Sequence, residues 1–208
     1  IRDRAAYEQS LQVSFATLRD RENLPRAMGW RWGRPKRLMI SPLLHRLGIS
    51  GFYFPWTAEA NLNRGVPAVS AAHALAHESA HQRGIARENE ANFVGFLVGW
   101  TSGDAWGRYG AAVFAQRQVL FALARQDAET ARTLVERRLP GVQRDVDDLR
   151  EYWNRYRGPL RTTARRVNHA YLRGNRVEGG VASYGRSLTL LLQWAASRGG
   201  RLDDALAL

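Results

Sequence analysis

The sequence predicts a mainly α fold with a small β element (α+β), formed by one domain of residues 1–208. Three observations carry this prediction. Apolar residues recur at helical spacing along most of the chain, between short Gly- or Pro-containing breaks. Residues 29–67 are interrupted by Gly and Pro too often to form a long helix. The 208 residues contain no internal repeat and no low-complexity linker, and this length suits a single domain.

The first half of the chain combines one helix with the β element. Residues 5–19 show apolar residues at helical spacing and are predicted to be helical. Residues 37–41 and 51–55 are predicted to be short strands, because they are rich in β-forming residues and bounded by turn residues. Residues 58–61 are a candidate third strand.

Helical patterning resumes at Pro67 and continues along the rest of the chain. Pro67 opens a predicted helix of about 17 residues, which Gly84 ends. Further helices are predicted at residues 86–100, 105–125, 128–138, 142–157, 160–173 and 181–196. We expect the later helices to form a C-terminal helical bundle.

Composition and charge limit the classes of function. The chain carries 31 Lys+Arg against 19 Asp+Glu, a formal net charge of +12, and Lys36 is its one lysine. The absence of cysteine excludes disulfides, a thiol nucleophile and Cys-ligated metal sites. No apolar run approaches the ~20 residues that span a bilayer. The arginines reflect either a GC-rich genome or a face that contacts anionic lipid, cell-wall polymer or nucleic acid.

Residues 77–81 read His-Glu-Ser-Ala-His, an HExxH motif inside a predicted helix. His77 and His81 are four residues apart and share a helix face, so both imidazoles can bind one tetrahedral Zn²⁺ at ~2.0–2.1 Å. Glu78 is rotated by ~100° around the helix axis. Its carboxylate would lie beside the metal and accept a proton from a bound water. The alternative is two hydrogen-bonded or solvated histidines with a surface glutamate between them.

The next predicted helix offers a third metal ligand, which a catalytic zinc site needs beside an open fourth position. Glu88 and Glu90 are ~200° apart on a helix, so only one of them can face the metal. Glu88 is favoured because it shares a face with the small Ala91 and with Asn92, a candidate partner of a ligand histidine. Glu90 is the alternative ligand.

Other polar residues are candidates for supporting roles. His73 lies one turn before His77, but this second histidine pair lacks a glutamate between its members, so we expect His73 to pack or to support a ligand. Glu59 and Asn61 are expected to line the cleft or to serve turn formation. The aromatic residues 52–54 are a candidate edge strand for pairing with an extended substrate, or part of the core.

Hydrolysis also needs a donor for the oxyanion that forms when water attacks a carbonyl. Tyr184 opens the last predicted helix after a Gly-rich loop, and Arg186 follows two residues later. We expect the Tyr184 hydroxyl to serve as this donor, with Arg186 binding substrate. Tyr171 and His169 are the alternative donors, and core or rim packing is the competing interpretation for each aromatic residue.

These motifs resemble those of gluzincin-type metallopeptidases, which combine HExxH with a downstream E-x-x-A-[DN] helix, matched here by residues 88–92. The chain more closely resembles an uncharacterised bacterial family, domain of unknown function 3810. Its signature HExxHQxG…ExEANF is matched by residues 77–84 and 88–93. The resemblance covers about residues 45–195. Ser79 departs from the bulkier apolar residue usual at that position, and it contacts no ligand.

The resemblance implies a zincin-like fold in which the HExxH helix is followed by a glutamate-bearing helix. It also implies one Zn²⁺ per chain and a peptide or protein substrate, without identifying that substrate. Family members look like membrane-anchored proteins with helices N-terminal to this domain. The chain, which starts at Ile1, is therefore expected to be a soluble fragment of a longer bacterial protein whose domain lies outside the cytoplasm.

Three functions are compatible with the sequence. The first is a zinc-dependent hydrolase, most simply a peptidase, in which Glu78 activates water for attack on an amide carbonyl. The second is a basic module that binds nucleic acid or an anionic membrane surface through the arginine-rich residues 31–37 and 161–176; without a nucleic-acid fold signature, nucleic acid is not expected. The third is a catalytically idle, metal-binding receptor or regulator.

Overall fold

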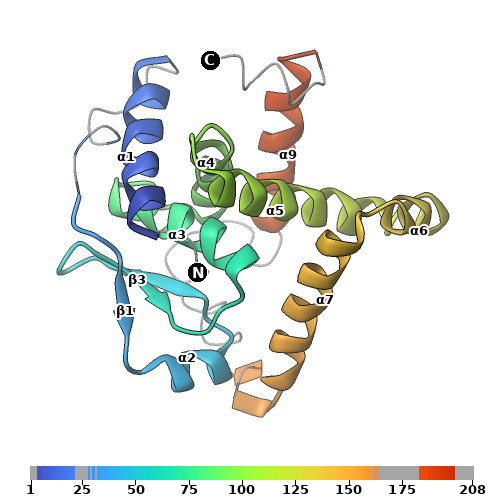
Figure 1. Ribbon diagram of the computed structural model, residues 1–208, viewed down its shortest axis with the longest axis horizontal. Coiled ribbons are helices and arrows are strands. Elements are labelled where there is room, and N and C mark those ends of the chain that lie inside the picture. Colours follow the sequence, from blue (N-terminus) through green and yellow to red (C-terminus); the bar gives the residue numbers. More distant parts are fainter. Residues whose placement is uncertain are drawn as a thin grey trace.

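The computed structural model describes residues 4–21, 28, 30, 32–160, 162–163 and 183–199. Within these ranges the protein is mainly helical and contains one small three-stranded sheet (Figure 1). The α+β prediction is confirmed in this coarse form. None of the helices in the described ranges has both the length and the apolarity that a membrane crossing requires.

The elements follow the predicted order with one addition. The helices are α1 (Arg4–Arg21), α2 (Ser41–Leu47), α3 (Ala68–Gln82), α4 (Glu88–Trp100), α5 (Ala105–Leu123), α6 (Ala128–Glu136), α7 (Pro140–Arg155) and α9 (Ser183–Ala196). The strands are β1 (Lys36–Leu38), β2 (Gly51–Phe54) and β3 (Glu59–Asn63). Helix α2 was not predicted. Pro42 occupies its first turn, where a missing N–H is tolerated, and Gly48 ends it with a φ of 75°. The helix predicted at residues 160–173 lies largely outside the described residues.

The sheet is built around β3. The strand order is β1-β3-β2, with β1 parallel and β2 antiparallel to β3. Phe52 of β2 is opposite Asn61 of β3. Ala60 and Leu62 of β3 are almost fully buried, and β3 and β2 both contact α3. Figure 1 shows the sheet beside α3, with β2 at one edge.

Helix α3 lies at the centre of the core. It packs against α4 and α5 and against the sheet. After its first residue, the alanines of α3 and Leu75 are buried on several sides of the helix, which is typical of a helix enclosed by neighbours. From α1, Tyr7 is fully buried and its hydroxyl donates a hydrogen bond to the Ala72 carbonyl oxygen at 3.1 Å. The HExxH helix is thus held by packing on several sides.

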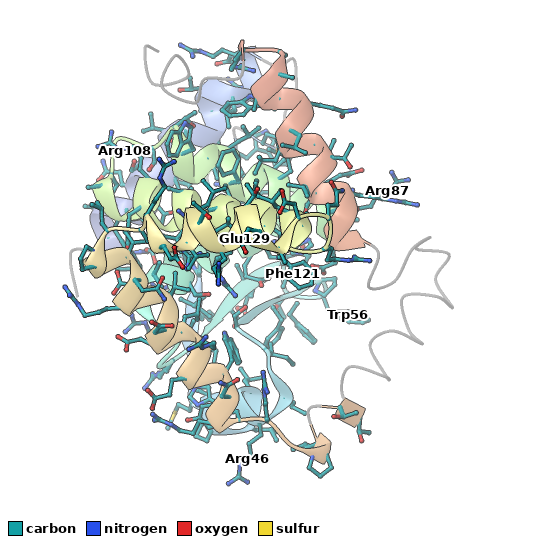
Figure 2. The ribbon with its side chains drawn as sticks, turned by 90° about the vertical axis from the view of Figure 1, so that its right-hand side faces the viewer. Arg46, Trp56, Arg87, Arg108, Phe121 and Glu129 are labelled. Carbon is teal, nitrogen blue, oxygen red and sulfur yellow. The ribbon has the colours of Figure 1, made fainter. Side chains whose placement is uncertain are left out.

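The C-terminal helices extend this central packing. Helix α9 packs on α4 and α5, and α6 packs on α5. Helix α7 contacts α3, and at its far end the ring of Tyr152 lies 5.5 Å from the ring of His45 in α2. Within the described residues, these helices therefore pack onto the α3–α5 core. Some apolar side chains stay at the surface, among them Trp56 and Phe121, which are 84% and 70% exposed (Figure 2).

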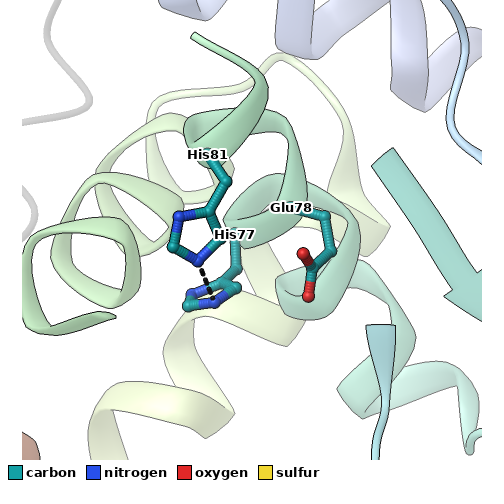
Figure 3. Close-up of side chains that lie close together, drawn as sticks. All are labelled: His77, Glu78 and His81. Carbon is teal, nitrogen blue, oxygen red and sulfur yellow. Dashed lines mark hydrogen bonds between the residues drawn. The ribbon is translucent and has the colours of Figure 1, made fainter. Parts of the chain in front are cut away.

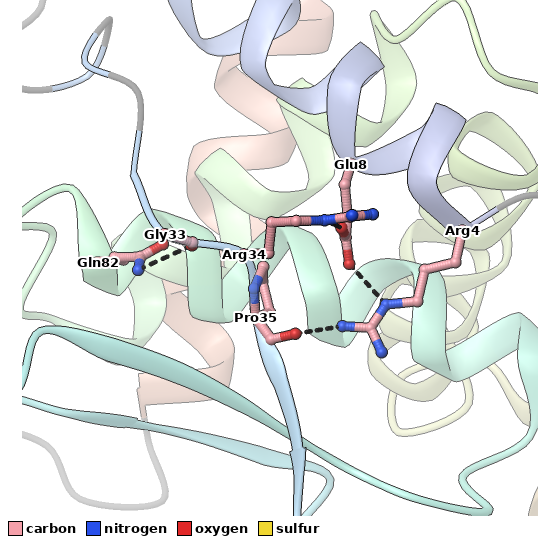
Figure 4. A network of polar contacts seen from close by, with 6 residues as sticks. All are labelled: Arg4, Glu8, Gly33, Arg34, Pro35 and Gln82. Atoms are coloured by element: carbon pink, nitrogen blue, oxygen red, sulfur yellow. Dashed lines mark hydrogen bonds and ion pairs between the residues drawn. The ribbon is translucent and has the colours of Figure 1, made fainter.

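A buried carboxylate attaches the segment before β1 to α1. Glu8 accepts hydrogen bonds from Arg4 and Arg34, each at 2.6 Å (Figure 4). Arg4 also donates to the Pro35 carbonyl oxygen at 2.6 Å. The Glu8 side chain is only 10% exposed, so its charge needs both partners. These contacts fix the chain that leads into the sheet.

Candidate metal centre

The end of α3 determines where α4 begins. Gly84 has a φ of 91°, a conformation that glycine adopts without strain, and the N–H of Ile85 donates to the Ala80 carbonyl oxygen at 3.2 Å. The sequence predicted that α3 ends at Gly84, and this geometry confirms it. Helix α4 starts shortly afterwards at Glu88, which brings its first turn next to the last turn of α3.

Three side chains from the two helices converge. The Nε2 atoms of His77 and His81 lie 3.1 Å apart (Figure 3). Oxygen Oε2 of Glu88 lies 3.3 Å from Nε2 of His77, and its Oε1 lies 3.5 Å from Nε2 of His81. Glu90 instead forms an exposed ion pair with Arg87 at 3.1 Å. The structure therefore brings Glu88, and not Glu90, to the two histidines.

Glu78 lies beside the histidine pair. One ligand atom each from His77, Glu78 and His81 lie within 4.8 Å of one another, so this cluster could hold a metal ion. In Figure 3 the Glu78 carboxylate occupies the side of α3 next to His77. Glu78 is only 4% exposed, and its buried Oε2 has no hydrogen-bond partner among the described residues. A buried oxygen in this state is costly unless it gains a proton or a polar neighbour.

The two glutamates respond differently to their surroundings. Burial raises the pKa of Glu78 to about 7; Glu88 adds to this effect, and the two histidines oppose it. Burial also acts to raise the pKa of Glu88, but hydrogen bonds and charge from His77 and His81 outweigh it and hold that pKa far below its ordinary value. Glu88 therefore stays ionised, while Glu78 can gain or lose a proton near neutral pH.

A hydrogen bond orients the His81 ring. Its Nδ1 lies 2.6 Å from the Ile85 carbonyl oxygen, which can only accept, so Nδ1 carries the proton and Nε2 faces His77 and Glu88. The ring of Tyr53 in β2 stacks over His81 at 6.5 Å with an interplanar angle of 19°. The edge strand thus lies directly over one candidate ligand.

His73 and Asn92 lie together, away from the converging atoms. His73 is half-buried, with both ring nitrogens enclosed, and its ring stacks on Phe114 with 3.6 Å between the ring centroids. Burial lowers the pKa of His73 to about 3, and the neighbouring Asn92 side chain opposes this shift. In the described part of the chain no hydrogen bond joins Asn92 to His77 or His81. The structure therefore places Asn92 beside His73, where it does not support a ligand histidine directly.

The two predicted residues of β3 differ in their surroundings. Glu59 pairs with Lys36 of β1 at the accessible end of the sheet. Asn61 is 3% exposed and donates to the Glu59 carbonyl oxygen at 3.0 Å. The Asn61 side chain therefore binds the backbone of its own strand, and the Glu59 carboxylate is occupied by its ion pair with Lys36.

The predicted oxyanion donor cannot be placed. Tyr184 belongs to the first turn of α9, but its side chain lies outside the described residues. Tyr171 and His169 also lie outside them. Arg186 is an exposed residue of α9. The roles expected for these residues stay predictions.

Three residues at the site were not anticipated from the sequence. A Cβ atom on Gly51 would lie 2.8 Å from Cγ of Glu78, and one on Gly95 would lie 3.0 Å from the backbone nitrogen of His77. Gln82 donates a hydrogen bond to the Gly33 carbonyl oxygen at 3.2 Å (Figure 4) and another to the Ala58 carbonyl oxygen at 2.9 Å. It thus ties the end of α3 to the segment before β1 and to the β2–β3 turn. Only the two glycines left a signal in the sequence. Glycine is unfavourable in a strand or in a helix interior unless close packing requires it, so Gly51 and Gly95 could have indicated a close approach.

Comparison with known proteins identifies a family but no activity. The model of the family described as "Protein of unknown function (DUF3810)" matches residues 5–192. The comparisons with curated proteins and with solved structures gave no match. The match covers nearly the whole chain, including α3, α4 and the sheet. The chain therefore belongs to the DUF3810 family of proteins of unknown function.

Proposed function

We propose that this protein is a zinc-dependent hydrolase that cleaves peptide bonds. The observation that carries the proposal is the convergence of His77, His81 and Glu88. The two histidine Nε2 atoms lie 3.1 Å apart, Oε2 of Glu88 lies 3.3 Å from Nε2 of His77, and Oε1 of Glu88 lies 3.5 Å from Nε2 of His81. Ligands bound tetrahedrally at ~2.0–2.1 Å stand ~3.3–3.4 Å from each other. Each observed separation is close to this value, so the two imidazoles and the Glu88 carboxylate could supply three ligands to a zinc ion and would leave a fourth position for water.

The donor set favours zinc over Ca²⁺ and Mg²⁺. Two imidazoles with one carboxylate are a frequent protein contribution to catalytic zinc sites. Ca²⁺ and Mg²⁺ prefer sites made wholly of oxygen. The ionised state of Glu88 and the fixed tautomer of His81 suit both residues as ligands without rearrangement.

Glu78 is the general base of the proposed reaction. When bound, Zn²⁺ supplies a Lewis acid that polarises the substrate carbonyl and makes water more acidic. Glu78 accepts the proton of the attacking water and then donates it to the departing amine. Among the described residues, its buried Oε2 has no hydrogen-bond partner that would compete with this water.

Strand β2 is the proposed binding edge for the substrate backbone. Among the described residues it pairs with β3 alone, so its other side can bind an extended peptide by strand addition. Tyr53 places this edge over His81. A peptide lying along β2 would bring a backbone carbonyl close to the metal and to Glu78, which is why we favour peptides as the substrate class.

The test separates metal binding from catalysis. Metal analysis of the purified protein is expected to show one zinc per chain, and zinc should be lost in His77→Ala and weakened in Glu88→Gln. Glu90→Gln is the matched control, because it alters a glutamate on the same turn that does not face the histidines, and it should keep its zinc.

Turnover is measured by mass spectrometry on a mixed peptide library. Glu78→Gln should keep zinc and lose cleavage by at least about a hundredfold, the range for a general base. Full activity in this variant would refute the mechanism. Zinc binding without cleavage of any peptide by the unaltered protein would refute the peptidase assignment in favour of an idle metal-binding protein.

A further inference from the structure

A cavity of about 660 Å³ lies at the start of α3, beside the first turns of α5 and one face of α7. Val69 of α3 lines it, and His77 follows eight residues later, ~12 Å along the helix axis. The cavity is therefore separate from the candidate metal centre. Its volume is within the range of small-molecule sites.

The cavity is acidic although the chain carries a net charge of +12. The lining residues of α7 that recur at helical spacing are Asp145, Asp148, Tyr152 and Arg155. Glu151 joins them, and its carboxylate accepts from Arg155 at 3.0 Å. Within the described part of the chain, Asp148 forms no ion pair and no hydrogen bond. Three carboxylates thus face a single guanidinium, and one of them is left without a partner.

Aromatic rings form the other walls, and hydrogen bonds hold two of them. The indole Nε1 of Trp106 donates to the Ala68 carbonyl oxygen at 2.7 Å. The Tyr109 hydroxyl donates to Oδ2 of Asp145 at 2.5 Å. Tyr152 also lines the cavity, and its buried hydroxyl oxygen has no hydrogen-bond partner in the part of the chain that the structure describes. The rings are therefore oriented before any ligand arrives, and one lining polar group lacks the partner that buried hydroxyls normally have.

We propose that this cavity binds an organic cation, meaning a primary ammonium or a guanidinium group. Such a cation gains attraction from the faces of Trp106 and the tyrosines and from the unpaired Asp148 carboxylate. An anion would be repelled by the same carboxylates. A bare divalent metal would prefer clustered oxygens to aromatic walls. The cation can belong to a free polyamine or to a basic side chain of a peptide.

Isothermal titration of the full chain with two probes tests the proposal. The probes are spermidine and the blocked tripeptide acetyl-Gly-Arg-Gly-amide. At least one should bind saturably with a Kd below about 1 mM. Asp148→Asn should weaken binding about tenfold, the loss of one charged contact. Asp147→Asn is the matched control: its carboxylate pairs with Arg150 and does not line the cavity, so binding should not change.

The two probes also distinguish the source of the cation. If only spermidine binds, the site is assigned to free amines. If only the tripeptide binds, the site is assigned to basic peptides. Either result supports the proposal. No saturable binding of either probe would overturn it. Equal weakening by Asp148→Asn and Asp147→Asn would also overturn it, because binding would then follow the general charge of α7. Neither readout depends on zinc or on hydrolysis.

Discussion

Replacing Gly51 with alanine tests the packing that positions the proposed general base. The new methyl carbon would lie 2.8 Å from Cγ of Glu78 and 2.8 Å from the carbonyl oxygen of Asn61, both closer than a methyl carbon can approach another heavy atom. The Asn61 oxygen belongs to the neighbouring strand and cannot move aside alone. Either β2 separates from α3, or the Glu78 side chain shifts.

The expected cost follows from two opposing effects. Overpacking at a buried position typically destabilises by about 1–3 kcal/mol. Replacing glycine by alanine stabilises by about 0.4–1 kcal/mol, because the unfolded chain loses conformational freedom. The net loss in the free energy of unfolding should be about 1–2 kcal/mol. Gly33→Ala is the matched control: its added methyl group meets no atom within 4 Å, so that variant should be unchanged or slightly more stable.

Urea denaturation monitored by circular dichroism measures both variants, and zinc content and peptide cleavage complete the assay. Gly51→Ala should keep its zinc, because the new methyl group does not contact the three proposed ligands. Its cleavage rate should fall with the displacement of Glu78. If Gly51→Ala proves as stable as Gly33→Ala, then β2 does not approach Glu78 as closely as the structure indicates, and the reasoning fails.

Three further predictions concern stability. Burial lowers the pKa of His73 to about 3, so acidification from pH 7 to 5 protonates this residue only in the unfolded chain. The free energy of unfolding should therefore fall by about 2 kcal/mol more in the unaltered protein than in His73→Leu. Equal pH profiles of the two proteins in urea titrations would contradict this prediction. Glu8→Gln should destabilise the protein by about 1–3 kcal/mol, because Arg4 is left partly buried without its charged partner. Glu129→Gln is the control: it removes a charge from an exposed ion pair and should change stability by less than about 0.5 kcal/mol in the same assay. Gln82→Leu should cost about 1–3 kcal/mol, because two partly buried hydrogen bonds are lost. Thermal unfolding at the wild-type midpoint would contradict this prediction.

The helices were predictable where periodicity extends over several turns. Residues 67–83 and 86–100 contain enough turns for an apolar face to be recognised, and the structure has α3 and α4 there. Helix α2 has only seven residues between Ile40 and Gly48, too few for a pattern to emerge. It also displaced the end of the predicted strand at residues 37–41, which the structure ends at Leu38.

The local part of the site was predictable as well. His77, Glu78 and His81 lie on one helix, so their spacing in sequence fixes their arrangement in space. The preference for Glu88 over Glu90 used helix geometry and the resemblance to a sequence pattern, and the structure places Glu88 beside the histidines. The identity of the metal and the activity stay predictions that the proposed experiments test.

By itself the sequence determined the order of the elements and the face of α3 that carries two imidazoles and a carboxylate, because both depend on interactions within a few residues. Tertiary structure alone decided which surfaces meet that face. Gly51, Tyr53 and Gln82 reached their roles only when the hairpin packed on α3, and the acidic cavity exists only where α3, α5 and α7 come together. Contacts between residues distant in sequence depend on how the whole core is filled, and no local pattern of residues encodes that.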